Sequence, residues 1–205
     1  MCLKAFLFSI AIVLCAPSAY TQSSIEKTLD STLNRLKNTS ETDASDTRIF
    51  DLLQNFYNEA LQADNGDLSQ ETVQNVNNYV SDTKTKNRHL LMLFLMYQQH
   101  ISQSAAKGKK PDSEYQVACT KLLEKEMNAV YSKVPTIVYI YKAEALQSHG
   151  KIEEAKATIV SALKVYPDSV PLKVYRYLDT QDEQIKNDLI KNHSGHWLVK
   201  QNGIK

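Results

Sequence analysis

The side chains most capable of chemistry in this sequence are five histidines and Cys119. His193 and His196 lie three residues apart near the C-terminus, and such a pair could contribute two nitrogen ligands to a metal ion. A protein zinc site needs three or four ligands. Asp188 and Glu183 are the only carboxylates near this pair in the sequence. A surface pair of histidines explains the spacing better, and the sequence therefore predicts no metal site.

Catalytic and cofactor motifs are absent from the sequence. Cys119 follows Ala118 and precedes Leu122 by three residues, which is typical of a buried structural thiol. No two of the five glycines lie within five residues, so there is no phosphate-binding loop, dinucleotide fingerprint or nucleophile elbow. Carboxylates such as Glu124 and Glu153 neighbour lysines, and solvated ion pairs explain them. We expect no catalytic residue and no cofactor, so the protein is not expected to be an enzyme.

Composition excludes further classes. Lys and Arg total 24 and Asp and Glu total 23, so the chain has no basic surface of the kind that binds nucleic acid. Only 5 glycines and 5 prolines occur in 205 residues. Sandwiches and barrels need a turn about every 8–12 residues, and this scarcity argues against them. The sequence predicts an all-α fold.

The N-terminus, residues 1–19, has the pattern of a signal peptide. Lys4 precedes an apolar stretch, Ala5 to Ala16, and small residues follow, with cleavage expected after Ser18, Ala19 or Thr21. The apolar stretch is too short to span a bilayer, which takes about 20 residues. The protein is expected to be exported to the periplasm or outside the cell, or to the ER lumen and beyond in a eukaryote.

Cys15 offers an alternative end to this leader. A lipid attached to this cysteine would anchor the mature chain to a membrane, and we expect membrane association by no other route. Bacterial lipoprotein signals usually place a small residue before that cysteine, whereas Leu14 stands there. A soluble exported chain is therefore the favoured prediction.

The remaining chain divides into two parts by its periodicity. Residues 23–45 form one amphipathic helix followed by a polar linker. Residues 46–205 form helix pairs joined by short turns, with a capping box at Asp67 and Gln70 starting one helix. The pairs are predicted at 46–84, 86–134, 136–166 and 170–192.

Residues 136–169 resemble a tetratricopeptide repeat. The segment carries the large and small residues of that motif at its own spacing: Tyr139, Ala143, Leu146, Gly150, Ile152, Ala155, Ile159, Ala162, Leu163 and Pro167. The resemblance implies a short helix-turn-helix solenoid (TPR-like), with degenerate pairs on either side of this repeat. It also implies that the first helix of each pair lines a concave groove for a protein or peptide partner.

In the matched repeat, this groove would be lined by Ile137, Ile140, Tyr141, Glu144 and Gln147. Repeats that clamp a terminal carboxylate carry Lys and Asn where this chain has Ile140 and Glu144, which argues against that ligand. In an alternative interpretation, Ile137 and Ile140 pack on the preceding pair instead of lining the groove.

The expected function is an exported, non-enzymatic TPR-like scaffold that binds a protein partner. One alternative is a structural accessory subunit of a cell-envelope complex, which a large apolar patch at one end of the solenoid would favour. A helical enzyme with a cleft is the third alternative, and it would need a pocket holding two or more His or carboxylate groups.

Overall fold

The computed structural model describes residues 24–205, and within this range it contains helices and no strands. The predicted all-α class is therefore confirmed, whereas the predicted leader, including Cys15, lies outside the described residues. The helices are α1 (Ser24–Lys37), α2 (Arg48–Tyr57), η1 (Asn58–Gln62), α3 (Gln70–Ser81), α4 (Arg88–Ala106), α5 (Ser113–Tyr131), α6 (Thr136–Ser148), α7 (Ile152–Val165), α8 (Val170–Thr180), α9 (Glu183–His193) and α10 (Trp197–Gln201).

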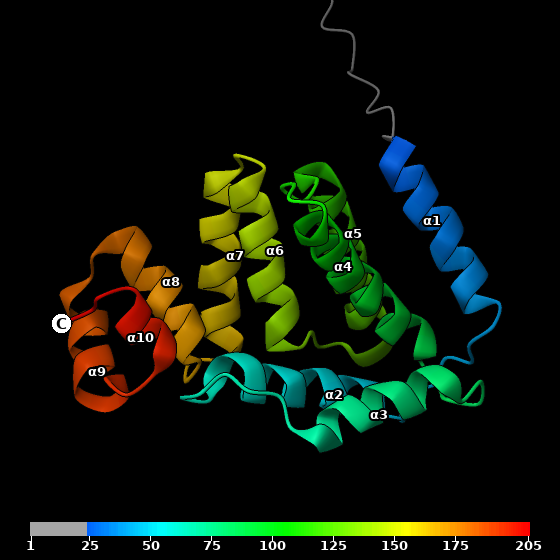
Figure 1. The fold of residues 1–205 in the computed structure, drawn as a ribbon, viewed down its shortest axis with the longest axis horizontal. Helices are drawn as coiled ribbons and strands as arrows, with labels where there is room; N and C mark the ends of the chain where they lie inside the picture. The colour runs from blue at the N-terminus through cyan, green and yellow to red at the C-terminus, as the bar shows by residue number, and fades with distance from the viewer. Residues whose placement is uncertain (1–23) are drawn as a thin grey trace, which may run out of the picture.

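Helices α4 to α9 form three consecutive hairpins that stand side by side (Figure 1). Each helix contacts the next along the chain, so α6 packs between α5 and α7. The turn between α6 and α7 contains Gly150 with φ of 79°, a conformation that glycine adopts without strain. The small side chains of Ala143 and Ala155 are buried on these two helices.

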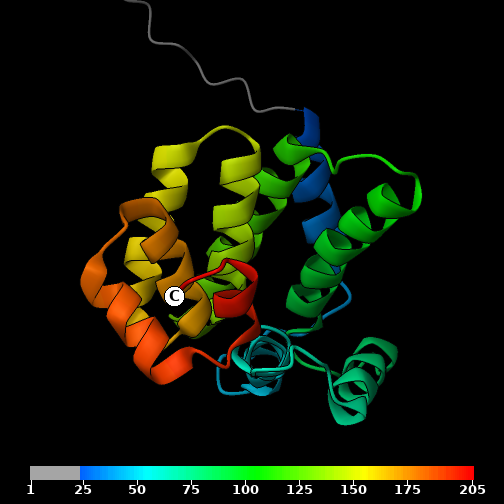
Figure 2. The same ribbon diagram turned by 60° about the vertical axis from the view of Figure 1, so that its left-hand side comes forward.

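Helix α2 and the single π-helical turn η1 run crosswise beneath the hairpins (Figures 1 and 2). Phe56 packs edge to face on Phe94 of α4, with ring centroids 5.3 Å apart. Gln54 Oε1 accepts a hydrogen bond of 3.3 Å from the backbone N–H of Thr136, which begins α6. Helix α2 thus contacts both α4 and α6, while η1 contacts α8. The interpretation of residues 46–84 as one more stacked hairpin is wrong in this respect.

The start of α3 also differs from the predicted capping box. Ser69 is the N-cap residue, and its Oγ accepts a hydrogen bond from the backbone N–H of Thr72 at 3.1 Å. The Glu59 carboxylate accepts hydrogen bonds from the Ser69 N–H at 2.8 Å and from the Thr72 hydroxyl at 2.9 Å. Because Glu59 of η1 fixes Ser69, the helix begins two residues later than Asp67 would dictate.

The N-terminal helix α1 packs against α4 and α5 through buried Leu29 and Leu33. Asn87, the N-cap residue of α4, holds the polar segment that follows α1. Asn87 is fully buried, and its φ is 56°. Its Nδ2 donates hydrogen bonds to the carbonyls of Asp43 at 2.6 Å and Asp46 at 3.0 Å. Its Oδ1 accepts from the Asp43 N–H at 2.9 Å. This one side chain fixes the predicted linker against the hairpins.

Candidate functional site

Two of the five predicted groove residues lie in the hydrophobic core. Ile137 is 0% exposed and Ile140 is 1% exposed, and both belong to the main core cluster. The prediction that they face an open groove is wrong, because α2, α5 and α7 all contact α6 and cover this stripe. The alternative interpretation, in which both isoleucines serve packing, describes them correctly.

The other three predicted residues, Tyr141, Glu144 and Gln147, follow one another at intervals of three along α6. Tyr141 and Glu144 are partly exposed and Gln147 is exposed. Gln98 of α4 donates a hydrogen bond of 2.7 Å from its Nε2 to the Tyr141 hydroxyl. The Tyr175 hydroxyl of α8 donates one to the Glu144 carboxylate. We call these five residues, Gln98, Tyr141, Glu144, Gln147 and Tyr175, the inner strip.

Aromatic rings support the inner strip from α4. Tyr141 stacks on Tyr97, with centroids 5.1 Å apart, and on Phe94, with centroids 6.0 Å apart. Tyr97, Gln98 and Tyr175 were not predicted as site residues, because the helix pairs that contain them match the repeat pattern only loosely. The aromatic content of these pairs was the only signal, and it fits a core equally well.

Glu144 has no cationic partner within the part of the chain that the structure describes. Among residues 24–205, no Lys, Arg or His forms an ion pair with it. Burial raises the pKa of Glu144, and the hydrogen bond from Tyr175 opposes this shift in part. Burial also raises the pKa of Tyr141 to about 12, so this phenol keeps its proton at neutral pH. The inner strip therefore offers one acid among neutral phenols and amides.

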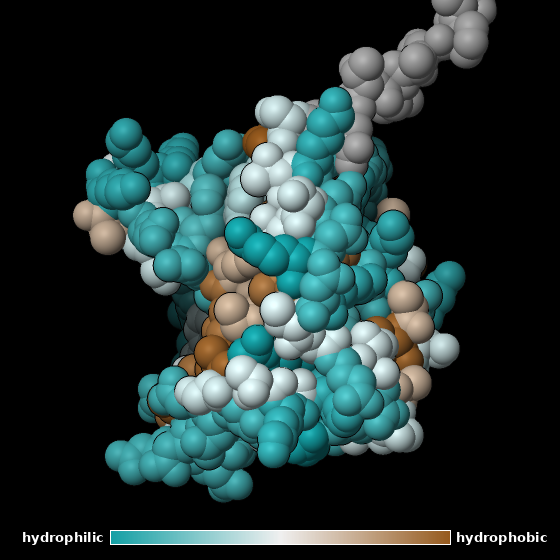
Figure 3. Space-filling model, turned by 90° about the vertical axis from the view of Figure 1, so that its right-hand side faces the viewer, coloured by the Kyte–Doolittle hydropathy of each residue, from teal (hydrophilic) through white to brown (hydrophobic). Residues whose placement is uncertain are grey.

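An apolar groove lies at one end of the inner strip, between α3 and α4. Figure 3 shows the side of the molecule that carries these helices, with apolar side chains gathered in a hollow. The groove measures about 250 Å³, and Leu68 and Val73 at its edge are 38% and 46% exposed. Its lining consists of Phe56, Leu68, Thr72, Val73, Val76, Asn77, Phe94, Leu95 and Gln98. Gln98 belongs to both the groove and the inner strip.

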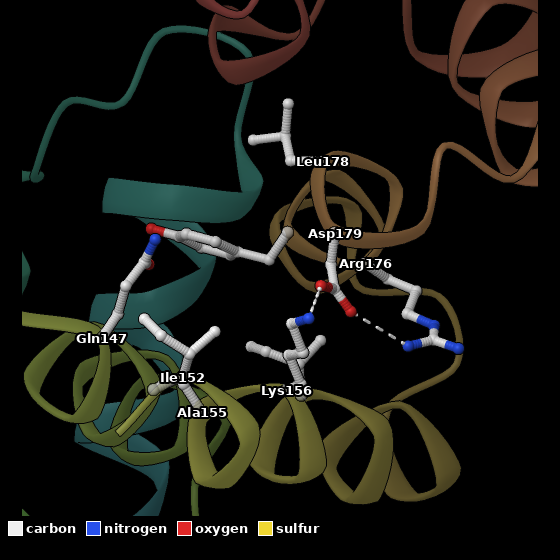
Figure 4. Close-up of a pocket in the computed structure, with 10 residues that line it drawn as sticks. Gln147, Ile152, Ala155, Lys156, Arg176, Leu178 and Asp179 are labelled. Atoms are coloured by element: carbon white, nitrogen blue, oxygen red, sulfur yellow. Dashed lines mark hydrogen bonds and ion pairs between the residues drawn. The ribbon is translucent and has the colours of Figure 1, made fainter. Parts of the chain in front are cut away.

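A second hollow, the wedge, lies at the other end, where α8 meets the α6–α7 hairpin. It measures about 340 Å³ and is lined by Ala143, Gln147, Ile152, Ala155, Lys156, Ile159, Tyr175, Arg176, Leu178 and Asp179. Figure 4 shows Gln147 of α6, Ile152 of α7 and Leu178 of α8 around this space. Ile152 and Leu178 are each 43% exposed. The wedge therefore has apolar walls at its mouth and two inner-strip residues, Gln147 and Tyr175, in its lining.

The charges in the wedge form ion pairs that join α7 and α8. Lys156 Nζ lies 2.8 Å from the Asp179 carboxylate, and Arg176 lies 3.4 Å from the same group (Figure 4). Lys156 also pairs with Glu153 at 3.2 Å. These cations are occupied by their own carboxylates, and neither forms an ion pair with Glu144.

The groups considered for catalysis and metal binding do not converge in the described residues. Burial raises the pKa of the Cys119 thiol to about 12, and the side chain is 0% exposed, so it is not an activated nucleophile. Residues 24–205 contain no group of three or more His, Cys, Asp or Glu side chains that could hold a metal ion. None of their helices is long and apolar enough to cross a membrane.

Comparison of the chain with protein-family models, curated proteins and solved structures finds no match. The function must therefore be inferred from the chemistry of the inner strip, the groove and the wedge.

Proposed function

We propose that this protein is an exported, non-enzymatic binding module of TPR type that holds a segment of a partner protein across the inner strip. The observation that carries the proposal is the placement of two apolar hollows at the two ends of one polar strip. Exposed apolar side chains that gather in a hollow are typical of sites that bind a partner. The amides and hydroxyls between the hollows suit the backbone and polar groups of a peptide.

The exposed apolar side chains of the groove and the wedge allow a direct test of the proposal. A library of 12-residue peptides displayed on phage is selected against the chain from residue 24, and the best binders are synthesised. We expect Val73→Glu in the groove and Leu178→Glu in the wedge each to weaken binding of these peptides at least tenfold, because each places a charge against the apolar side chains of the peptide. Fluorescence anisotropy with a labelled peptide measures the affinity.

Val165→Glu is the matched control, since Val165 is 48% exposed and lines neither the groove nor the wedge. Its affinity is expected to stay within twofold of the parent. Equal weakening by all three substitutions, or no enrichment of any peptide over an unrelated helical protein, would contradict the proposed function.

Export is part of the proposal and has its own measurement. When the full chain is expressed with residues 1–23 in a host that exports proteins, we expect the mature product to begin after Ser18, Ala19 or Thr21, because these sites follow the small-residue region of the leader. Intact-mass spectrometry of the exported fraction distinguishes the three. A full-length chain retained inside the cell would overturn the export prediction, and a lipid mass on Cys15 would favour the anchored form instead.

A further inference from the structure

We infer that the inner strip recognises a basic side chain, Lys or Arg, in the partner segment, with Glu144 as its counter-charge. The inference rests on the proposed function and specifies the chemistry of the segment that binds. It follows from charge complementarity at Glu144, from the rings around this carboxylate and from the wedge that opens beside it.

Glu144 differs from the other carboxylates that are partly or fully buried on the hairpins. Glu124 pairs with Lys142 at 2.6 Å, and Asp188 pairs with Lys173 at 2.6 Å. Glu126 pairs with Lys37. Glu144 has the Tyr175 hydroxyl as a hydrogen-bond donor but no cationic partner in residues 24–205. A desolvated carboxylate without a counter-charge is costly, and a cation brought by a ligand removes that cost.

The rings around Glu144 suit a cation as well. The Tyr175 hydroxyl bonds to the Glu144 carboxylate, and Tyr141 lies three residues before Glu144 on α6 with its ring stacked on that of Tyr97. Burial is the main cause of the raised pKa of all three phenols, and the charge of Glu144 adds to it. A cation within about 6 Å of an aromatic ring is attracted by the negative face of the ring. Tyr175 lines the wedge, so its ring lies beside the space that a ligand would fill.

The wedge adjoins this carboxylate through Tyr175, which lines the wedge and donates the hydrogen bond to Glu144. Gln147 and Tyr175 belong to both the wedge and the inner strip, and the apolar side chains of Ile152 and Leu178 flank the mouth. The aliphatic stem of Lys or Arg packs on apolar walls while its charged end seeks a polar group. The cations of the wedge, Lys156 and Arg176, are held by Asp179. A peptide with apolar residues next to one basic residue fits this arrangement.

The test uses the same 12-residue phage library, selected in parallel on the parent chain and on Glu144→Gln. We expect the parent to select peptides with Lys or Arg at one fixed position beside apolar residues, and Glu144→Gln to lose that preference. The best peptide is then synthesised again with norleucine in place of the basic residue. We expect this change to raise the dissociation constant at least tenfold, and we expect the same of Glu144→Gln with the original peptide.

The two changes act on one contact, so together they are expected to weaken binding little more than either alone, in a double-mutant cycle. Glu124→Gln is the matched control, because Lys142 already neutralises that carboxylate, and its affinity is expected to stay within twofold of the parent. Circular dichroism melting verifies that Glu144→Gln is folded, and the norleucine peptide tests the contact on the unaltered chain.

Selected peptides without a basic preference would overturn this inference and leave the proposed function standing. So would a basic preference that survives in Glu144→Gln, or a norleucine peptide that binds as well as its parent. Failure to select any peptide would overturn the proposed function, and this inference with it.

Discussion

Replacing Asn87 with alanine is expected to lower the free energy of unfolding by about 3 kcal/mol, because hydrogen bonds of about 1 kcal/mol each are lost and alanine is strained at positive φ. Asn87 is 0% exposed and bonds to the backbone of Asp43 and Asp46 and to the Tyr131 hydroxyl. In a chain of this size, such a loss corresponds to a fall in melting temperature of about 10 °C. Thermal unfolding followed by circular dichroism measures it.

Asn87→Gly separates the two causes. Glycine adopts φ of 56° without strain, so this variant is expected to lose only the hydrogen bonds and to melt above Asn87→Ala. Gln181→Gly is the matched control, since Gln181 has φ of 54° at the exposed end of α8. It is expected to be neutral or slightly stabilising. A melting temperature of Asn87→Ala within about 2 °C of the parent would show that the linker is not fixed by this side chain.

Acid is expected to destabilise the fold through His89. This side chain is 1% exposed, and burial lowers its pKa to about 4, with the nearby charge of Lys37 acting in the same direction. Below its ordinary value of 6.5 the unfolded chain binds a proton at His89 that the folded chain does not, so stability falls as pH falls through this range. Between pH 6.5 and 4 the loss attributable to His89 is expected to reach about 3 kcal/mol.

Urea unfolding at a series of pH values checks this prediction. In His89→Asn the decline of unfolding free energy between pH 6.5 and 4 is expected to be shallower than in the parent, whatever its stability at pH 7. Burial also lowers the pKa of His196, so part of the slope remains in this variant. His149→Asn controls for the removal of one exposed histidine. Parallel slopes in the parent and in His89→Asn would contradict the assignment.

The sequence predicted the helices well where local signals agree. Apolar spacing, Gly150 and Pro167 place α6 and α7 within a few residues of their observed bounds. The sequence could not predict that α2 crosses the hairpins, because the position of α2 depends on contacts between residues distant in the chain. The hydrogen bond of 2.6 Å between the Tyr57 hydroxyl and Ser169 Oγ is one such contact.

The candidate site was predicted in part for the same reason. The resemblance to a tetratricopeptide repeat implied that Tyr141, Glu144 and Gln147 share one face of this helix, and they follow one another at intervals of three on α6. The repeat pattern could not distinguish these three residues from Ile137 and Ile140, because burial on α6 is decided by contacts with α2, α5 and α7. The partners Gln98 and Tyr175 come from α4 and α8, whose alignment with α6 is a tertiary property.

The crosswise position of α2 and η1 also bears on how the chain can unfold and evolve. In repeat proteins each unit contacts only its neighbours, so units can unfold stepwise and can be duplicated or deleted. Here α2 contacts α4 and α6, and η1 contacts α8. Removing or inserting a hairpin would displace at least one of these contacts. We therefore expect the three hairpins to unfold as one cooperative unit and not stepwise.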